Sequence, residues 1–554
     1  MNKNVFMVLV IFMMGSALVF AGGQSAASSN KGVAVDANDG PLTPYKTPLT
    51  INVMRENNTD IWFPPGESIK DNILTRFYKE KLNIVYNVMW TAERGQYSQQ
   101  LDLAIAANDL PDMFEASRNQ VYRLAAAGQS EPLTKYYDRY VTGPVKADYE
   151  YGNKEYLTLA TVNNDLYAVP MSDDFAGRTS LLYMRQDWLD KLGLKAPTNL
   201  QEFMAVSDAF VNRDPDGNGV KDTYAMTLST WLEYSFDYIA NAFGHYPNQW
   251  HDYGGKLAYT DLQPSILGPL NFLRDMYSRG YIDPQFAVKD YWSKVSEDVA
   301  AGRIGMVPGV FWHGIWSGII GNKSANPAAD WSVYPILKND QGKYNKPIAD
   351  ITCFRFLVVR KGFPNPEAAF KGQNLWRELW RGEYSEYYHG NNQRDYNKAM
   401  EDFKLYPPFW YDPPTKNYDV CLPMRAAWAN NRDITMLKDQ EAIKHFRNFL
   451  ETVEGRSPSL NGWGEMIIRL HSWDIVEKIY GGSDPSNYVF TKYAGPTDRV
   501  IAEREPLVDR VRQEFIVKYI MDQDSDFQGF VNNWLRAGGQ EMTDTVNVWY
   551  ARNK

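Results

Sequence analysis

The order of the elements near the start of the chain constrains the fold more than any other feature of the sequence. Three segments rich in β-branched and aromatic residues alternate with two segments whose apolar residues recur at helical spacing. This β-α-β-α-β order predicts a mostly parallel sheet with helices on both faces. The expected strands cover residues 49–54, 84–90 and 113–115, and the expected helices cover 71–82 and 97–107.

A second alternating set follows, with strands expected over 167–170, 180–184 and 304–307. Thr198 is the expected first cap of a helix, in a capping box with Gln201, and further helices are expected over 269–277 and from Asn365 onward. The 554 residues exceed what one compact core of ordinary size needs, so two or more lobes are expected. In sheets of this kind, ligands bind outside the carboxyl ends of the strands.

Composition excludes several classes of protein. A formal net charge of −9 gives no electrostatic basis for binding nucleic acid. The content of 44% hydrophobic and 23% charged residues is ordinary for a globular protein and argues against a polytopic membrane protein. The 17 Trp, 36 Tyr and 26 Phe would suit the faces of sugar rings, although many of these rings must fill a large core.

The first 21 residues read as a signal peptide. Lys3 precedes an apolar run that reaches Phe20, and Ala21 ends a small-x-small cleavage pattern. The alternative is an uncleaved anchor, but the run is shorter than the roughly 20 residues of a membrane span. No cysteine lies near the cleavage pattern, so a lipid anchor is not supported. We expect a periplasmic or extracellular protein in which residues 22–47 form a flexible tether.

Cys353 and Cys421 are the two cysteines of the chain. In an exported protein they could form one disulfide, and two buried thiols are an equal alternative. Without a CxxC pair, a zinc or iron–sulfur site built on cysteine is not expected.

The sharpest local motif is DPDGNGVKD at residues 214–222, which matches the start of a calcium loop. Calcium takes six to eight oxygen ligands, and alternating residues bring their oxygens to one side. Ala225 stands at loop position twelve in place of the bidentate Glu, so we expect a structural Ca²⁺ site and not a sensor EF-hand. The alternative is a turn without metal. The expected ligands are Asp214, Asp216, Asn218, Val220 through its carbonyl, and Asp222.

Several segments, in their order and spacing, carry a resemblance to a known family. LAIAANDLPD at 103–112 and YMRQDWLDKLGL at 183–194 resemble segments of family 1 extracellular solute-binding proteins, and the calcium-like loop follows at the spacing of the large LipO-like, oligosaccharide-binding branch. Further resemblance lies in GYIDP at 280–284, AGRIGM at 301–306 and the C-terminal residues 530–550. The chain departs from that branch where the lipoprotein cysteine is missing and where Thr223 replaces a frequent Glu.

The resemblance implies an α/β, type II periplasmic-binding-protein fold, with two α/β lobes joined by hinge strands that close on a ligand. Lobe one would comprise 48–171 plus 354–418, and lobe two 172–353 plus 419–554. Cys353 and Cys421 then lie near the expected crossings between lobes, where a disulfide would brace the hinge. The implied function is that of a monomeric ligand trap without catalysis, which delivers an oligosaccharide to the transmembrane subunits of an ABC permease.

The candidate ligand residues follow strand ends or lie near the hinge. Trp312 resembles the position where maltose-binding relatives stack a sugar. For the others, a turn, a surface charge or a core ring is an equal alternative, and the three arginines would suit an acidic sugar. The candidates are Arg55, Glu56, Asn57, Ser117, Arg118, Asp173, Arg178, Trp231 and Trp312.

Other functions fit parts of the sequence. A secreted carbohydrate-active enzyme would use paired carboxylates, but the 67 acidic residues make no pair informative. The sequence contains no GxSxG, HExxH or Walker-type motif. A binding protein for a non-sugar solute, or a chemosensory trap, also stays open.

Overall fold

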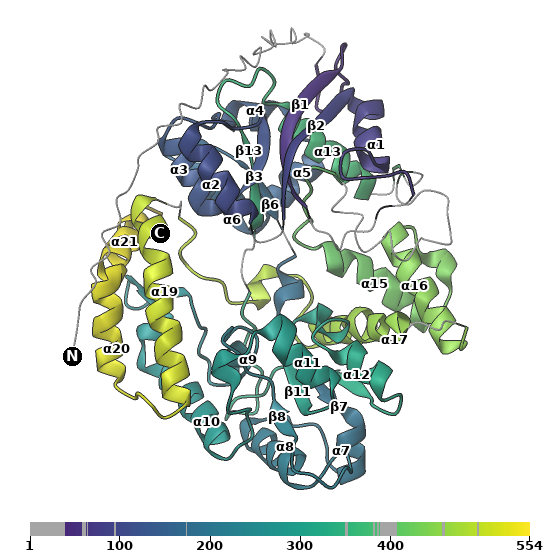
Figure 1. Ribbon diagram of the computed structural model, residues 1–554, viewed down its shortest axis with the longest axis vertical. Coiled ribbons are helices and arrows are strands. Elements are labelled where there is room, and N and C mark those ends of the chain that lie inside the picture. Colours follow the sequence, from purple (N-terminus) through teal and green to yellow (C-terminus); the bar gives the residue numbers. More distant parts are fainter. Residues whose placement is uncertain are drawn as a thin grey trace, which may run out of the picture.

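The computed structural model describes residues 39–57, 63, 65–93, 96–172, 174–349, 353–380, 383–384, 387, 407–456, 460–495 and 498–553. The predicted signal peptide and the first part of the predicted tether lie outside these residues. Figure 1 shows two α/β bodies one above the other, with helices α19 to α21 along one side and α15 to α17 along the other. Among the described residues, no helix combines the length and apolarity needed to cross a membrane.

The first body contains a five-stranded sheet in the order β2-β1-β3-β13-β6. Strand β1 pairs in parallel with β2 and β3, as the β-α-β order predicts, and β13 pairs antiparallel with both β3 and β6. Strand β13 therefore comes from a segment that follows β6 by almost two hundred residues in the chain. The strands are β1 (Leu49–Asn57), β2 (Ile84–Glu93), β3 (Met113–Ala116), β6 (Val169–Ser172) and β13 (Cys353–Val359).

The second body contains a four-stranded sheet in the order β12-β7-β11-β8. Its pairing is mixed, because β11 runs parallel to β8 and antiparallel to β7. The strands are β7 (Leu181–Arg185), β8 (Tyr224–Met226), β11 (Ile304–Gly309) and β12 (Trp331–Tyr334). Two small hairpins complete the strands, β4 (Thr161–Val162) with β5 (Asp165–Leu166), and β9 (Trp250–Asp252) with β10 (Leu257–Tyr259).

Helices surround both sheets. Those of the first body are α1 (Ile73–Leu82), α2 (Tyr97–Ala107), α3 (Arg118–Ala126), α4 (Thr134–Tyr140), α5 (Gly143–Tyr149), α6 (Tyr151–Leu159) and α13 (Ala368–Trp380). Those of the second are α7 (Gln186–Leu192), α8 (Leu200–Asn212), α9 (Ser235–Ala242), α10 (Leu267–Ser278), α11 (Ser296–Ala300) and α12 (Ile319–Ala325). The C-terminal helices are α15 (Lys416–Ala429), α16 (Gln440–Val453), α17 (Asn461–Met466), α18 (Trp473–Lys478), α19 (Arg499–Ile520), α20 (Phe527–Trp534) and α21 (Gln540–Asn553).

Local capping explains where several helices begin. The Asn72 side chain accepts the backbone N–H groups of Leu74 and Thr75, which satisfies two donors that the first turn of α1 leaves open. The predicted cap of α8 at Thr198 is one residue early, because the Asn199 side chain accepts from the Glu202 backbone. The partner of Thr198 is Glu202, whose carboxylate accepts from both its backbone and its hydroxyl, and not Gln201.

Two large apolar cores divide the described residues between them. One core draws on residues between Tyr45 and Val169 and between Phe356 and Tyr411, and the other on residues between Phe175 and Ala349 and between Cys421 and Val546. A smaller core lies between α15 and α16. The chain therefore passes between the large cores three times, near residues 172–174, 349–353 and 412–420.

Residues 39–47, which the sequence assigns to the flexible tether, pack on the first body. The Tyr140 hydroxyl donates to the Asp39 carboxylate at 2.8 Å, and the buried Lys371 ammonium donates to the Thr43 carbonyl at 2.7 Å. Tyr45 is buried and donates to Glu367 at 2.8 Å. These contacts give the end of the predicted tether a fixed position because each satisfies a polar group against the core.

Both cysteines are thiols in the structure and form no disulfide with each other, but of the two only Cys421 is buried, while Cys353 is half-buried. Cys421 is fully buried within α15, and burial raises the pKa of its thiol to about 12. Cys353 packs against the core of the first body, whereas Cys421 belongs to that of the second.

Candidate functional site

The chain topology brings the ends of many strands to one edge of each sheet. The carboxyl ends of β1, β2 and β3 share an edge with the beginning of β13, because β13 runs antiparallel. In the second sheet the end of β11, at Gly309, lies beside the start of β7, at Leu181. The candidate ligand residues lie at strand ends or in the segments that follow them.

Five aromatic side chains gather after the ends of β8 and β11, and we call them the aromatic platform. They come from three segments: the loop after β8, the π-helix η5 (Tyr291–Val295), and the 3₁₀ turn η6 (Phe311–Gly314) after β11. Helices α9 and α11, which directly follow two of these segments, lie on the side of the second body nearer the first (Figure 1). The members are Trp231, Tyr234, Trp292, Trp312 and His313.

The rings of the platform contact one another in a continuous series. Trp292 stacks on Trp312 with ring centroids 5.6 Å apart and an interplanar angle of 24°, and Trp231 meets Trp292 edge-on at 6.2 Å. Trp231 is 47% exposed and Trp292 is 40% exposed. Exposed indole faces supported by other rings form an apolar surface with polar edges, the kind of surface on which a sugar ring packs.

His313 lies buried beneath Trp312, with ring centroids 4.3 Å apart. Its Nδ1 accepts the Val310 backbone N–H at 3.0 Å, so the imidazole is neutral with its proton on Nε2. Burial lowers the pKa of His313 to about 3. Gly309 is required at this place, since a Cβ there would lie 2.4 Å from the imidazole Cγ.

Tyr234 joins the platform through a strained backbone. Its φ of 66° and ψ of −64° lie outside the regions that side-chain-bearing residues ordinarily adopt. Its ring packs on His313 at 4.5 Å and meets Trp312 edge-on at 6.1 Å. Strain of this kind costs about 1–3 kcal/mol and tends to occur at functional sites.

The facing edge of the first sheet carries a cluster of charged residues. Arg355 of β13 donates to the Glu115 carboxylate at 3.0 Å and also to the Glu56 carboxylate. Its guanidinium lies 5.0 Å from the centroid of the Tyr97 ring. Burial alone would lower the pKa of Arg355, but Glu115 and Glu56 outweigh burial and raise it. Arg55 is buried beside Glu115, and burial lowers its pKa although Glu115 opposes this.

The other predicted residues of the first body have structural partners. Asn57, which ends β1, donates to Glu93 at 2.9 Å, and Ser117 caps α3 by accepting the Gln120 backbone N–H at 3.3 Å. Arg118 reaches the C-terminal region, where it donates to the Gly495 carbonyl at 2.6 Å. Asp173 lies outside the described residues. The sequence predicted that Arg55, Glu56 and Asn57 follow the first strand. In the structure they are the last three residues of β1.

The structure therefore unites two of the predicted residues and separates others. Trp231 and Trp312 join one cluster through Trp292, and the positive charge of Arg178 acts on Tyr234 in the same cluster. Sequence reasoning missed Tyr234, Trp292, His313, Glu115 and Arg355. The aromatic run at 311–316 is a signal that could have found His313.

Two crossing segments between the bodies are joined by buried hydrogen bonds. The Ser172 hydroxyl donates to the Asp412 carbonyl at 2.9 Å, and the Asp412 N–H donates to the Ser172 carbonyl at 2.9 Å. The buried Asp174 carboxylate accepts the backbone N–H groups of Gly177 at 3.0 Å and Asn417 at 2.7 Å. A motion of one body relative to the other must bend or break these bonds.

The calcium-like loop lies on the surface after α8. The Asp214 carboxylate accepts the N–H groups of Gly217 at 3.0 Å and Gly219 at 3.1 Å. The Asn218 amide nitrogen donates to Asp216 at 2.8 Å and to Asp222 at 3.2 Å, so Asp216, Asn218 and Asp222 converge. In the part of the chain that the structure describes, no three acidic, His or Cys side chains converge as a metal site.

The donor set of the loop nevertheless fits a hard cation. Oxygen is the donor that Ca²⁺ prefers, and the loop carries three carboxylates and one amide. The Asn218 oxygen accepts the Val220 N–H at 2.6 Å, so the amide would have to rotate to offer its oxygen beside Asp216 and Asp222. The Thr223 hydroxyl donates to the buried Phe210 carbonyl at 2.7 Å and takes no part in the loop.

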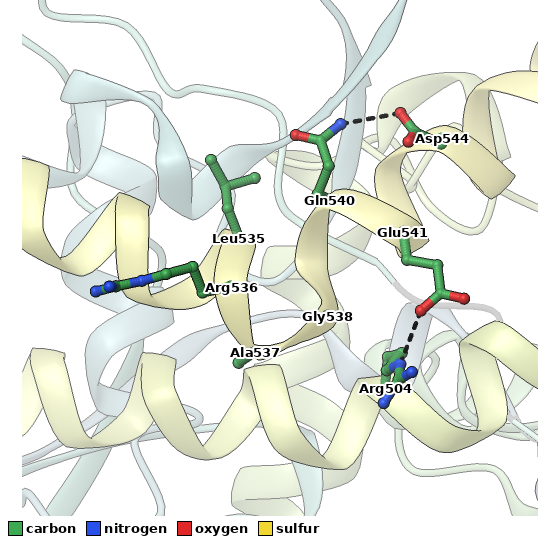
Figure 2. A pocket seen from close by; sticks show the side chains of 8 residues that line it. All are labelled: Arg504, Leu535, Arg536, Ala537, Gly538, Gln540, Glu541 and Asp544. Carbon is green, nitrogen blue, oxygen red and sulfur yellow. Dashed lines mark hydrogen bonds and ion pairs between the residues drawn. The ribbon is translucent and has the colours of Figure 1, made fainter.

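A surface hollow of about 420 Å³ lies between α19 and the π-helix η12 (Leu535–Gly539), far along the chain from the platform. Figure 2 shows four of its polar side chains in two pairs, while Arg536 pairs with none of the other residues drawn. Arg504 donates to Glu541 at 2.9 Å and Gln540 to Asp544 at 2.9 Å.

Comparisons with known proteins place the chain among solute-binding proteins. The sequence pattern of the bacterial extracellular solute-binding proteins matches residues 62–371, more than half of the chain. Lipoprotein LipO of Bacillus subtilis (strain 168) is 26% identical over 226 residues, which cover 40% of this chain and 43% of LipO. The fructooligosaccharide ABC transporter substrate-binding protein FusA of Streptococcus pneumoniae serotype 4 is 26% identical over 274 residues, 47% of this chain and 49% of FusA. The chain thus matches less than half the length of these curated relatives.

Solved structures extend the likeness over almost the whole chain. S. pneumoniae FusA in complex with kestose superimposes with a TM-score of 0.59 at 15% identity, covering 91% of this chain and 99% of FusA. The alginate-binding protein AlgQ2 without calcium ion gives a TM-score of 0.57 at 14% identity, covering 93% of this chain and 100% of AlgQ2. These likenesses confirm the predicted two-lobed α/β fold of the periplasmic binding proteins. By its sequence pattern and its fold, the chain belongs to the bacterial extracellular solute-binding protein family.

Proposed function

We propose that the chain is the extracytoplasmic binding component of an ABC importer and traps an oligosaccharide by closure of its two lobes, without chemistry. The observation that carries the proposal is the aromatic platform at the strand ends of the second sheet, with the exposed indoles of Trp231 and Trp292 beside Trp312. The strained backbone of Tyr234 within the same cluster adds support, since strain of this kind tends to occur at functional sites.

The proposal includes the lobe boundaries of 48–171 plus 354–418 and 172–353 plus 419–554. The division of the two cores near the same residues supports it, with the adjustment that Ser172 and Cys353 belong to strands of the first sheet. It also includes export directed by residues 1–21, action as a monomer and contact with permease subunits. FusA, by its name a fructooligosaccharide ABC transporter substrate-binding protein, supports the carbohydrate and the transporter parts of the proposal.

We further propose that the loop at 214–222 binds Ca²⁺. Asp214, Asp216 and Asp222 would provide carboxylate oxygens, Asn218 its amide oxygen after rotation, and Val220 its carbonyl. The ion would neutralise three carboxylates on one short loop, and it would tie the end of α8 to the start of β8. One solved relative of similar fold, a FusA EF-hand mutant, supports a comparable site in that protein.

Titration calorimetry of the exported protein with fructo-, malto- and xylo-oligosaccharides tests the proposal. At least one should bind with a stoichiometry near one, and mass spectrometry should recover the sugar intact. Trp312→Ala and Trp292→Ala should each weaken binding by about 30-fold, the effect of losing about 2 kcal/mol at a central aromatic contact. Trp428→Ala is the matched control, because Trp428 packs on Phe446 and Phe449 in the separate small core.

Two results would contradict the proposal. Equal weakening by Trp428→Ala would mean that the platform has no special role. A cleaved sugar after incubation would indicate a carbohydrate-active enzyme in place of a binding protein.

A further inference from the structure

We propose that the ligand is an uncharged oligosaccharide, and that the ion pairs at the edge of the first sheet exclude acidic sugars. This inference rests on the proposed function, which it refines by naming the class of sugar. It reverses the reading that three arginines among the candidate residues favour an acidic ligand.

The cations of the first sheet edge already have anionic partners. Arg355 donates one side of its guanidinium to Glu115 at 3.0 Å and another to Glu56. Arg55, the second arginine of the edge, lies close enough to Glu115 for the carboxylate to favour its charged form. Two guanidiniums thus face two carboxylates, and the charges of these four described groups balance.

Arg118 is occupied at one nitrogen of its guanidinium, while its buried Nε has no hydrogen-bond partner among the described residues. Its Nη2 donates to the Gly495 carbonyl at 2.6 Å, and its positive charge acts on Glu505 and Tyr493 of the C-terminal region. Glu505 is the negative charge that acts most on Arg118. A ligand carboxylate that bound to Nη2 would have to displace a hydrogen bond that joins the first body to the C-terminal segment.

The platform itself disfavours anions. Glu233 and Asp237 both act on Tyr234 as negative charges, against the single positive charge of Arg178. His313, the one imidazole of the platform, is neutral because its Nδ1 accepts the Val310 N–H. Of the charges that act on Tyr234, two are negative and one is positive, and this balance does not favour a uronic acid stacked on Trp292 or Trp312.

A neutral sugar needs no such compensation. Its C–H faces pack on the indoles, and its hydroxyls can accept from guanidinium N–H groups or donate to carboxylates that remain paired with each other. Paired charges at the edge of the first sheet can therefore contribute hydrogen bonds without selecting a charged ligand. Glu56 and Glu115 are, in this view, the residues that determine specificity against acidic sugars.

Calorimetry with two matched sets of probes tests the inference. The neutral set is nystose, maltotetraose and xylotetraose, and the acidic set is trigalacturonate and tetramannuronate. We expect binding to a member of the neutral set and a dissociation constant at least about 100-fold higher for every acidic probe. Preferred binding of an acidic probe would overturn this inference while leaving the proposed function intact. Failure of all five probes to bind would overturn both.

A variant that neutralises the two carboxylates of the edge gives an independent test of the inference. In Glu56→Gln/Glu115→Gln the Arg355 and Arg55 guanidiniums lose their anionic partners, so the edge gains two net positive charges. We expect this variant to bind trigalacturonate at least about tenfold more tightly than the native chain does, with a gain that falls as salt rises. Glu514→Gln, which removes one carboxylate from an exposed ion pair with Arg510 on α19, is the matched control for each single substitution and should show no gain.

Circular dichroism and the melting temperature should establish that the double variant is folded. Should it fail to fold, the single variant Glu56→Gln tests the same idea, because Glu56 is the more exposed of the two acids at the edge. No gain for acidic probes in a folded variant, or an equal gain in Glu514→Gln, would refute the role of these ion pairs.

Discussion

Replacement of His313 by Asn should remove a specific source of acid instability from the second body. The imidazole is fully buried, and its Nδ1 already accepts the Val310 N–H, so protonation would bury a charge and also break that bond. Asn cannot titrate, and its Oδ1 can accept in place of Nδ1. The loss of ring packing against Trp312 and Tyr234 lowers the stability of the variant at every pH.

The magnitude follows from the difference in pKa between the folded and unfolded states. Burial lowers the pKa of His313 from 6.5 to about 3. Between these values the unfolded chain binds the proton and the folded chain does not, so stability falls as the pH falls below 6.5. Going from pH 8 to pH 5, this group should remove about 2 kcal/mol from the native protein and nothing from the variant.

Urea unfolding of both proteins, followed by tryptophan fluorescence at pH 8 and pH 5, measures the difference. Other groups titrate in both proteins and cancel, so the stability gap between native and variant should shrink by about 2 kcal/mol at pH 5. In calorimetric melting this corresponds to about 4–8 °C for a lobe of this size. A gap that is the same at both pH values would refute the buried, neutral state of His313.

Two further predictions concern the hinge and the loop. Asp174→Ala leaves the Gly177 and Asn417 N–H groups without their carboxylate and should cost about 3 kcal/mol of stability, measured by urea unfolding, while Asp109→Ala on the exposed turn after α2 should cost far less. Added Ca²⁺ should raise the melting temperature of the native chain, and EDTA should reverse the rise. Asp216→Asn should abolish this response. A melting temperature of the native chain that changes neither with Ca²⁺ nor with EDTA would contradict the proposed calcium site.

Elements that depend on neighbouring residues could be predicted closely. The helix expected over 97–107 is found at those residues, because Leu101 and Ile105 face the core and Asn108 ends the helix in the left-handed conformation. Strand β1 is three residues longer than expected, since its polar end pairs with β2, from Arg55 opposite Thr91 to Asn57 opposite Glu93. Nothing local in 353–359 predicts that β13 lies between β3 and β6, which precede it by some two hundred residues.

The platform shows the same division between local and distant information. Trp312 could be found because it follows a strand end directly, and strand ends are where this class of sheet binds ligands. Trp292 could not, because it lies in a π-helix that contacts η6 only through tertiary packing. Tyr234 is recognised by its backbone strain, which no sequence pattern reports.

The charge of the binding site is the property that neighbouring residues in the sequence predict least well. Arg55 and Arg118 each follow or end a strand, and counted alone they suggest a binding site for an anion. The partners that change this reading are far away in sequence: Arg355 lies 240 residues after Glu115 and 299 after Glu56, and Gly495 lies 377 after Arg118. A cation at a strand end therefore argues for an anionic ligand only after the carboxylates that the fold brings to it have been counted. In our proposal that count leaves the indoles, and not the guanidiniums, as the groups that select the ligand.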